Sequence, residues 1–155
     1  MPFIPTSLDA ACCVASLVSG VLTASGLPEC RPALAPAVSP ETGAEAMPAA
    51  YAIPVSHSFE RAARKVMRHE VDVALLLICE VPEGDSPEER AAEWLGVLQT
   101  AAEAVLESGT TPNAGVKFVS AEAAELADAE LLALSGIFRA QINVRCLLLS
   151  GPAQS

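Results

Sequence analysis

Few residues in this 155-residue chain have the type and spacing that catalysis or metal binding requires. A histidine can act as a general base or a metal ligand near neutral pH. His57 and His69 are the only two histidines, and both lie in polar sequence at an expected loop and an expected strand start. We interpret each as a structural polar residue. The adjacent carboxylates Glu88 and Glu89 follow Ser86-Pro87, where helix capping explains them better than acid–base catalysis.

The cysteines do not indicate a metal site or a catalytic nucleophile. Their number is odd, and no Cys-x-x-Cys or Cys/His pair has the spacing of metal ligands. Two of them lie inside apolar runs, where a free cysteine behaves as a small hydrophobic residue, so we expect reduced thiols. The sequence also lacks nucleotide-binding, HExxH and GxSxG motifs. We therefore predict no catalytic residue, no cofactor and no metal ion, and a protein that is not an enzyme. The five cysteines are Cys12, Cys13, Cys30, Cys79 and Cys146.

A cluster of basic residues is the charge feature that stands out, because one short segment holds four of the nine Lys and Arg residues. Three interpretations remain open: a solvated loop face, a contact with nucleic acid, which the net charge disfavours, or a contact with an acidic surface on another protein. A second copy of this chain offers such a surface, and opposite charges on separate patches suit head-to-tail association into a ring. The basic residues are Arg61, Arg64, Lys65 and Arg68. The acidic candidates are Glu122, Glu125, Asp128 and Glu130.

Composition limits the classes of function. Nine basic and 19 acidic residues give a net charge of −10, which disfavours non-specific binding to DNA, RNA or anionic membranes. With 52% hydrophobic and 18% charged residues, the chain should be folded along most of its length. Aromatic residues make up only 4%, so the core should be aliphatic and alanine-rich. The length suits a single domain, residues 1–155.

The N-terminal third combines a helix with proline-rich sequence. After a short extended arm, residues 1–5, the spacing predicts a helix over Leu8–Ser25 that ends at Gly26. Both of its faces are apolar, so we expect burial on two sides, part of it against a neighbouring subunit. It lacks the preceding positive charge of a secretory signal and is interrupted by polar residues, so we do not expect it to span a membrane. Residues 28–49 are irregular and rich in proline, with an extended arm or edge strand near Glu29–Val38.

The rest of the chain alternates strands and helices. We expect a short strand at Ala50–Val55, and then a polar segment, Ser56–Arg68, that forms either a helix or a long hairpin loop. A strand over His69–Val81 should enter the sheet interior, since it becomes apolar on both sides. Ser86-Pro87-Glu88-Glu89 predicts a capped helix that ends at Gly109.

A strand at Val116–Ser120 and a loop with one short helix over Ala121–Ser135 should follow. The strict alternation of Gly136–Leu149 then predicts a long strand, before a tail over residues 151–155. We expect an α+β fold, a mostly antiparallel twisted sheet with two main helices packed on it.

This order of elements resembles the tail terminator and neck (tail completion) proteins of long-tailed bacteriophages and gene transfer agents. The resemblance is concentrated in a short strand (AYAIPV), a basic segment (SFERAARKV) and a long strand (HEVDVALLLICEV). Glu60, Arg61 and Arg64 match the basic loop of that family, and Ile137–Leu149 is similar to its closing strand. The Pro/Ala-rich stretch Arg31–Pro48 departs from the pattern.

The resemblance implies a structural virion protein that forms a ring, a hexamer, at the head-proximal end of the tail tube. Such a ring stops tube polymerisation and joins the tail to the head connector protein, while DNA passes through without specific binding. The expected interface residues are Glu60, Arg61, Arg64, Lys65 and Arg68. The expected location is the virion, after assembly in the host cytoplasm. A head-completion or connector adaptor protein, and a small cytoplasmic α+β enzyme or ligand-binding domain, are the alternatives.

Overall fold

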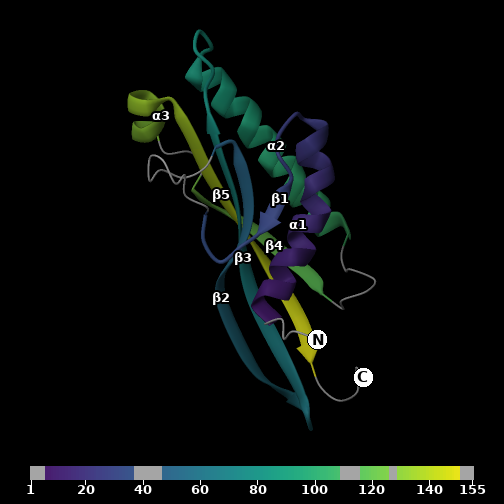
Figure 1. Ribbon diagram of the computed structural model, residues 1–155. Coiled ribbons are helices and arrows are strands. Elements are labelled where there is room, and N and C mark those ends of the chain that lie inside the picture. Colours follow the sequence, from purple (N-terminus) through teal and green to yellow (C-terminus); the bar gives the residue numbers. More distant parts are fainter. Residues whose placement is uncertain (1–5, 37–46, 109–115, 126–128, 151–155) are drawn as a thin grey trace.

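A five-stranded mixed sheet with helices on one face forms the framework of this computed structural model (Figure 1), which confirms the expected α+β class. The structure describes residues 6–36, 47–108, 116–125 and 129–150. The strand order is β1-β2-β3-β5-β4, and every pairing except β1 with β2 is antiparallel. The elements are α1 (Thr6–Ala24), β1 (Cys30–Pro32), β2 (Ala49–Ala63), β3 (Val66–Glu80), α2 (Pro87–Ser108), β4 (Lys117–Glu125), α3 (Ala129–Ser135) and β5 (Ile137–Ser150).

The main core lies between the sheet and the two long helices. Helix α1 covers β1, β2 and β3, while α2 lies over β4 and β5. Alternate residues of β3 and β5 point towards these helices, as the period of two predicts. Phe138 is fully buried beneath Trp94, with their ring centroids 5.3 Å apart. Other contributors to this core include Val14, Val18, Leu22, Ala52, Val73, Leu75, Leu98, Val105, Val144 and Cys146.

A second, smaller apolar cluster occupies the opposite face of the sheet at the beginning of β2. Tyr51, Leu76 and Ile78 are buried there, and two residues of the connection between β1 and β2, Ala33 and Met47, pack against them. The proline-rich region therefore covers part of the outer face. This cover explains why β3 is apolar on both sides at this point.

Helix α1 is long and apolar enough to cross a bilayer by length and composition alone. In the fold it is a core helix, because one side packs on the sheet and on α2. Within one chain the helix is buried on one side only, since its outward stripe consists of small or polar residues, and contact of that stripe with a neighbouring subunit stays a prediction. That stripe is Asp9, Cys12, Ser16, Gly20 and Thr23.

The predicted cap of α2 is present. The backbone N–H of Glu89 donates a hydrogen bond to Ser86 Oγ at 3.4 Å, and Pro87 occupies the first helical position.

All five cysteines are free, and burial raises the pKa of Cys30, Cys79 and Cys146 to about 12, which keeps these thiols protonated.

The structure corrects several boundaries. Ser56–Arg68 contains neither a helix nor a long loop, because β2 runs to Ala63 and β3 starts at Val66 after a two-residue turn. Strand β4 continues to Glu125, since its pairing with β5 extends that far. The strand expected near Glu29–Val38 is only three residues long. Helix α3 confirms the short helix expected within Ala121–Ser135. The arm at 1–5, residues 37–46, the helix end at Gly109 and the tail lie outside the described residues.

Burial of α2 generates a stability prediction. Leu98 is fully buried in the core, so Leu98→Asp places a charge in an apolar site and should abolish cooperative unfolding. Ala92 lies on the exposed side of the same helix, and Ala92→Asp should change the free energy of unfolding by less than about 0.5 kcal/mol. Thermal melts followed by circular dichroism compare the two variants, and a native-like melt for Leu98→Asp would contradict the assigned helix face.

Candidate interaction surface

The β2–β3 hairpin projects beyond the helices as an arm, which we define as residues 56–72 (Figure 1), and β5 pairs along its β3 strand as far as Met67. Every residue from Val55 to Lys65 is exposed. Strand β1 pairs only with Ala50, Tyr51 and Ala52 of β2, so along the arm the outer edge of β2 pairs with no other strand of the described chain. Such an edge offers backbone groups to another chain.

A β-bulge separates the arm from the body of the sheet. The register between β2 and β3 shifts between Pro54 and Ser56, which leaves Val55 unpaired. Proline has no N–H to donate and is tolerated at bulges and edges for that reason. A bulge increases the local twist of a strand pair, so this one sets the direction in which the arm leaves the sheet.

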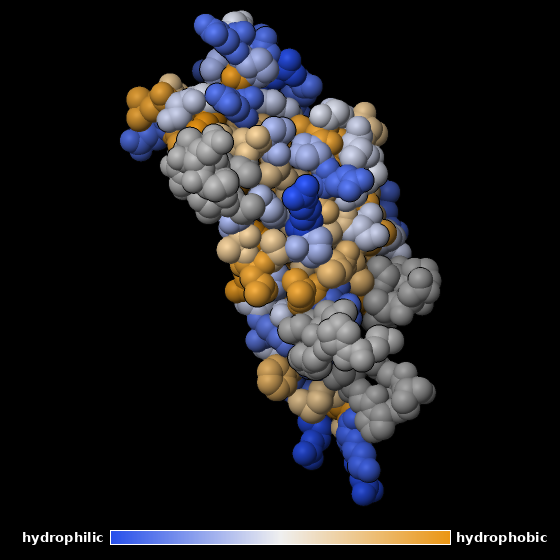
Figure 2. Space-filling view, viewed as in Figure 1, coloured by the Kyte–Doolittle hydropathy of each residue, from blue (hydrophilic) through white to orange (hydrophobic). Residues whose placement is uncertain are grey.

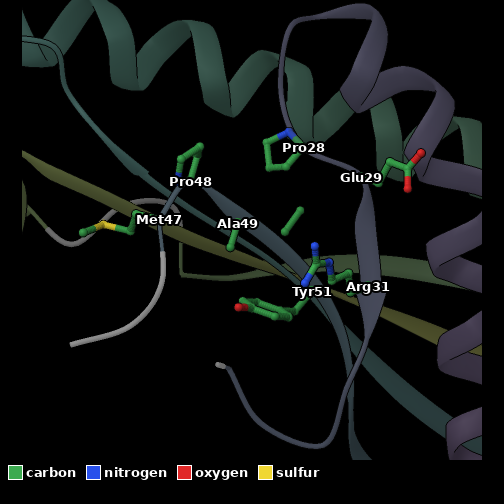
Figure 3. Close-up of a pocket in the computed structure, with 8 residues that line it drawn as sticks. Pro28, Glu29, Arg31, Met47, Pro48, Ala49 and Tyr51 are labelled. Carbon is green, nitrogen blue, oxygen red and sulfur yellow. The ribbon is translucent and has the colours of Figure 1, made fainter. Parts of the chain in front are cut away.

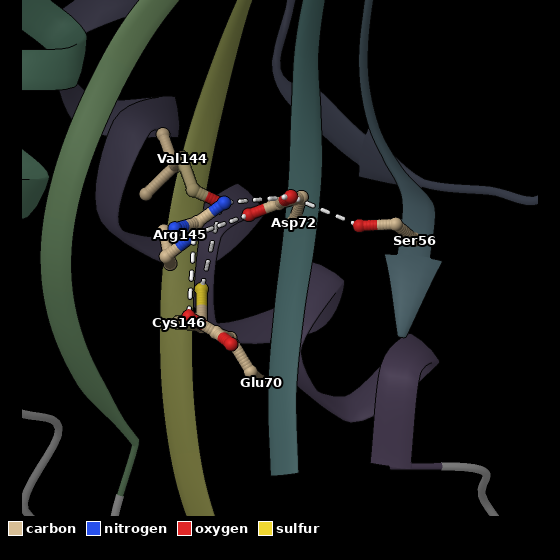
Figure 4. Close-up of polar contacts among 6 residues, drawn as sticks. All are labelled: Ser56, Glu70, Asp72, Val144, Arg145 and Cys146. Carbon is tan, nitrogen blue, oxygen red and sulfur yellow. Dashed lines mark hydrogen bonds and ion pairs between the residues drawn. The ribbon is translucent and has the colours of Figure 1, made fainter. Parts of the chain in front are cut away.

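A polar network joins three strands at the base of the arm (Figure 4). Arg145 Nε of β5 lies 3.1 Å from Asp72 Oδ1 and 3.5 Å from Glu70 Oε1, both of β3. Ser56 of β2 donates a hydrogen bond to Asp72 Oδ2 at 2.9 Å. The hydrogen bond from Arg145 and that from Ser56 lower the pKa of Asp72 despite its partial burial, so this carboxylate stays charged and holds the register of the arm.

An aromatic cluster lies on the other face of the arm. His57 Nε2 and His69 Nδ1 are 2.9 Å apart, so one ring donates a hydrogen bond to the other. Phe59 is 63% exposed and stacks at a tilt against both rings, at centroid distances of 5.4 and 5.6 Å. Partial burial, and then the charge of His57, lower the pKa of His69. Sequence reasoning placed the two histidines in separate polar segments, and only the hairpin register makes them diagonal neighbours.

The predicted interface residues gather at the distal end of the arm, but on different sides of it. Glu60 and Arg68 are directly opposite on the outer face, and their ion pair, at 3.9 Å with both side chains exposed, contributes little stability. Arg61 continues the face that carries His57 and Phe59. The remaining two cations, Arg64 and Lys65, form the turn, where Lys65 has a positive φ of 61°. Figure 2 shows hydrophilic side chains extending from this end of the molecule.

Of the acidic candidates, Glu130 lies at the end of the sheet opposite the basic tip, whereas Glu122 lies mid-sheet, where its partner Asn143 also pairs with Ala74 of β3. Glu122 is exposed on β4 and Glu130 is exposed on α3. The side chain of Glu125 and the whole of Asp128 lie outside the described residues. Helix α3 leads into β5 at Ile137, which pairs with Glu80, twelve residues along β3 from Arg68. At about 3.3 Å per residue, the basic tip and α3 are roughly 40 Å apart.

A shallow depression of about 330 Å³ lies where β1 meets the start of β2 (Figure 3). Apolar side chains of Pro28, Met47 and Pro48 line it together with Glu29 and Arg31. The described residues hold no group of three or more His, Cys, Asp or Glu side chains placed to bind a metal ion.

No family model matches this chain, and no curated protein matches it either. The functional interpretation therefore depends on the order of elements and on the geometry of the arm.

The histidine pair predicts a dependence of stability on pH. An unperturbed histidine has a pKa of 6.5, and that of His69 is lower in the folded chain. Below 6.5 the unfolded state therefore binds a proton that the native state does not, so stability falls as pH decreases through this window. Urea unfolding at about pH 7.5 and about pH 5.5 measures the free energy of unfolding at each pH. The decrease between the two pH values should be smaller for His69→Gln than for the unmodified protein. His57→Gln removes only the second cause of the shift and should be intermediate. Equal losses in all three proteins would contradict the assigned role of the pair.

Proposed function

We propose that this protein is a structural virion subunit, a tail terminator that assembles head-to-tail into a ring at the head-proximal end of a phage-type tail tube. One observation carries the proposal: the basic tip of the arm and Glu130 of α3 lie at opposite ends of the sheet. A separation of roughly 40 Å keeps these charges from pairing within one chain. Two copies arranged head-to-tail bring them together.

The strand edges support the same arrangement. Strand β4 ends the sheet on one side, and β2 is unpaired along the arm on the other side, among the strands that the structure describes. Two different edges on opposite sides of a sheet favour a heterologous contact, which forms a ring when the rotation between copies closes. The resemblance of the sequence to tail terminators supplies the expected hexamer, the tube protein as one partner and the head connector as the other.

The overall charge fits a channel through which DNA passes. A ring of chains that each carry −10 has an acidic surface, and such a surface repels phosphate groups instead of retaining them. The four cations of the arm are used in this proposal for contacts between protein subunits.

Charge reversal on the arm should weaken the ring. Arg64→Glu places a negative charge at the tip, and like-charge contact with the acidic end of the next copy should raise the dissociation constant by about tenfold or more. Arg31→Glu, on the exposed surface of β1, changes the net charge by the same amount away from the arm and serves as the matched control. Sedimentation velocity over a concentration series measures both variants.

Salt provides a second readout of the same contact. Raising the ionic strength from about 0.1 M to about 0.5 M should weaken the unmodified ring, because exposed charges are screened. An oligomer that is insensitive to both salt and Arg64→Glu would remove the arm from the interface. A chain that stays monomeric and binds neither tail tubes nor the head connector would contradict the proposed function.

A further inference from the structure

A small apolar depression of about 240 Å³ lies beside the arm, on the face of the sheet that the long helices leave uncovered. Leu147 and Leu149 of β5 contribute its apolar surface, and Leu149 is 53% exposed. Arg68 of β3 is directly opposite Leu149, and Lys117 of β4 is directly opposite Leu147. Arg68 and Lys117 therefore flank the exposed Leu149 and the half-buried Leu147, while Glu70, opposite Leu147, is paired with Arg145. Such a surface favours a segment that is both apolar and acidic.

Helix α3 has these two properties. Leu134 is 78% exposed, more than any other large hydrophobic residue of the described chain. Glu130 precedes it by four residues, so the two side chains lie on the same side of the helix. Leu132 packs on the main core and fixes α3 on its other side. Figure 2 shows hydrophobic surface at the position of α3.

A seven-residue helix gains little stability from its own hydrogen bonds, and α3 has no fully buried residue within this chain. Contact with another surface would supply the missing packing. The depression of the same chain is out of reach, because α3 adjoins Glu80 at the far end of β3 while the depression adjoins Arg68.

We propose that α3 of one copy docks on the Leu147–Leu149 depression of the next copy. Leu134 contacts the two leucines of the depression, and Glu130 lies between Arg68 and Lys117. This inference rests on the proposed head-to-tail ring and names the two surfaces that meet in it. The arm lies next to the depression, so the same contact brings its distal cations close to the acidic end of the neighbouring copy.

Substitution of an exposed leucine on either side tests the contact. Leu134→Asp and Leu149→Asp should each raise the dissociation constant of the ring by about tenfold or more, since both remove apolar contact and Leu149→Asp also places a negative charge against the acidic α3. Leu34 is 75% exposed near β1, and Leu34→Asp is the matched control that should leave association unchanged. All three positions are exposed, so urea unfolding should verify that each variant remains folded.

A charge exchange gives a second, independent measurement. Glu130→Lys should weaken the ring, and combination with Lys117→Glu should restore at least part of the association. Recovery in the double variant, but in neither single variant, would show that these two residues meet between copies.

The outcomes separate this inference from the proposed function. A ring that forms normally with Leu134→Asp and Leu149→Asp would overturn the α3 contact and leave the ring intact. Weakening by Leu149→Asp alone would show that the depression receives a segment other than α3, which also overturns the assignment. A monomeric unmodified protein would overturn both proposals.

Discussion

Backbone pairing of β3 along both of its edges is the constraint on which the rest of this structure depends. Strands β2 and β5 pair with it over nearly its full length, although the buried core adjoins it only from Val71 onward. The residues before Val71 continue the same ladder beyond the core and form one strand of the arm. A two-stranded hairpin is marginally stable by itself, and β5 supplies this one with a third strand as far as Met67. Here it extends a packed sheet, and the network of Arg145, Asp72 and Ser56 links three strands where it leaves the core.

The parts of the fold that were predictable are those where burial leaves a periodic pattern. The alternation in β5 identified its buried side in advance, and Ser86-Pro87 identified the start of α2. The arm was missed because its residues are exposed on both faces, so no apolar period marks a strand between Ser56 and Ala63. Pairing with β3 determines the conformation of this segment, and a short window of sequence does not contain that interaction.

The candidate site was predictable as a set of residues but not as a geometry. The basic residues were recognised from their density along the chain, and the hairpin brings them to one end of the molecule while dividing Arg61 and Arg68 between its two faces. The contact of His57 with His69 and the depression beside Leu149 both depend on cross-strand register, and a β-bulge between β2 and β3 shifts the first of these by one residue. These features therefore required the structure.

Separate positive and negative ends on one rigid sheet favour association in which each copy contacts the next through unlike surfaces. Electron cryomicroscopy of the assembled protein at subunit resolution tests this central claim most directly. We expect a closed ring in which the arm of each copy lies against the β4–α3 end of its neighbour. A solitary chain, or a two-fold dimer joined through the same surface on both copies, would contradict it.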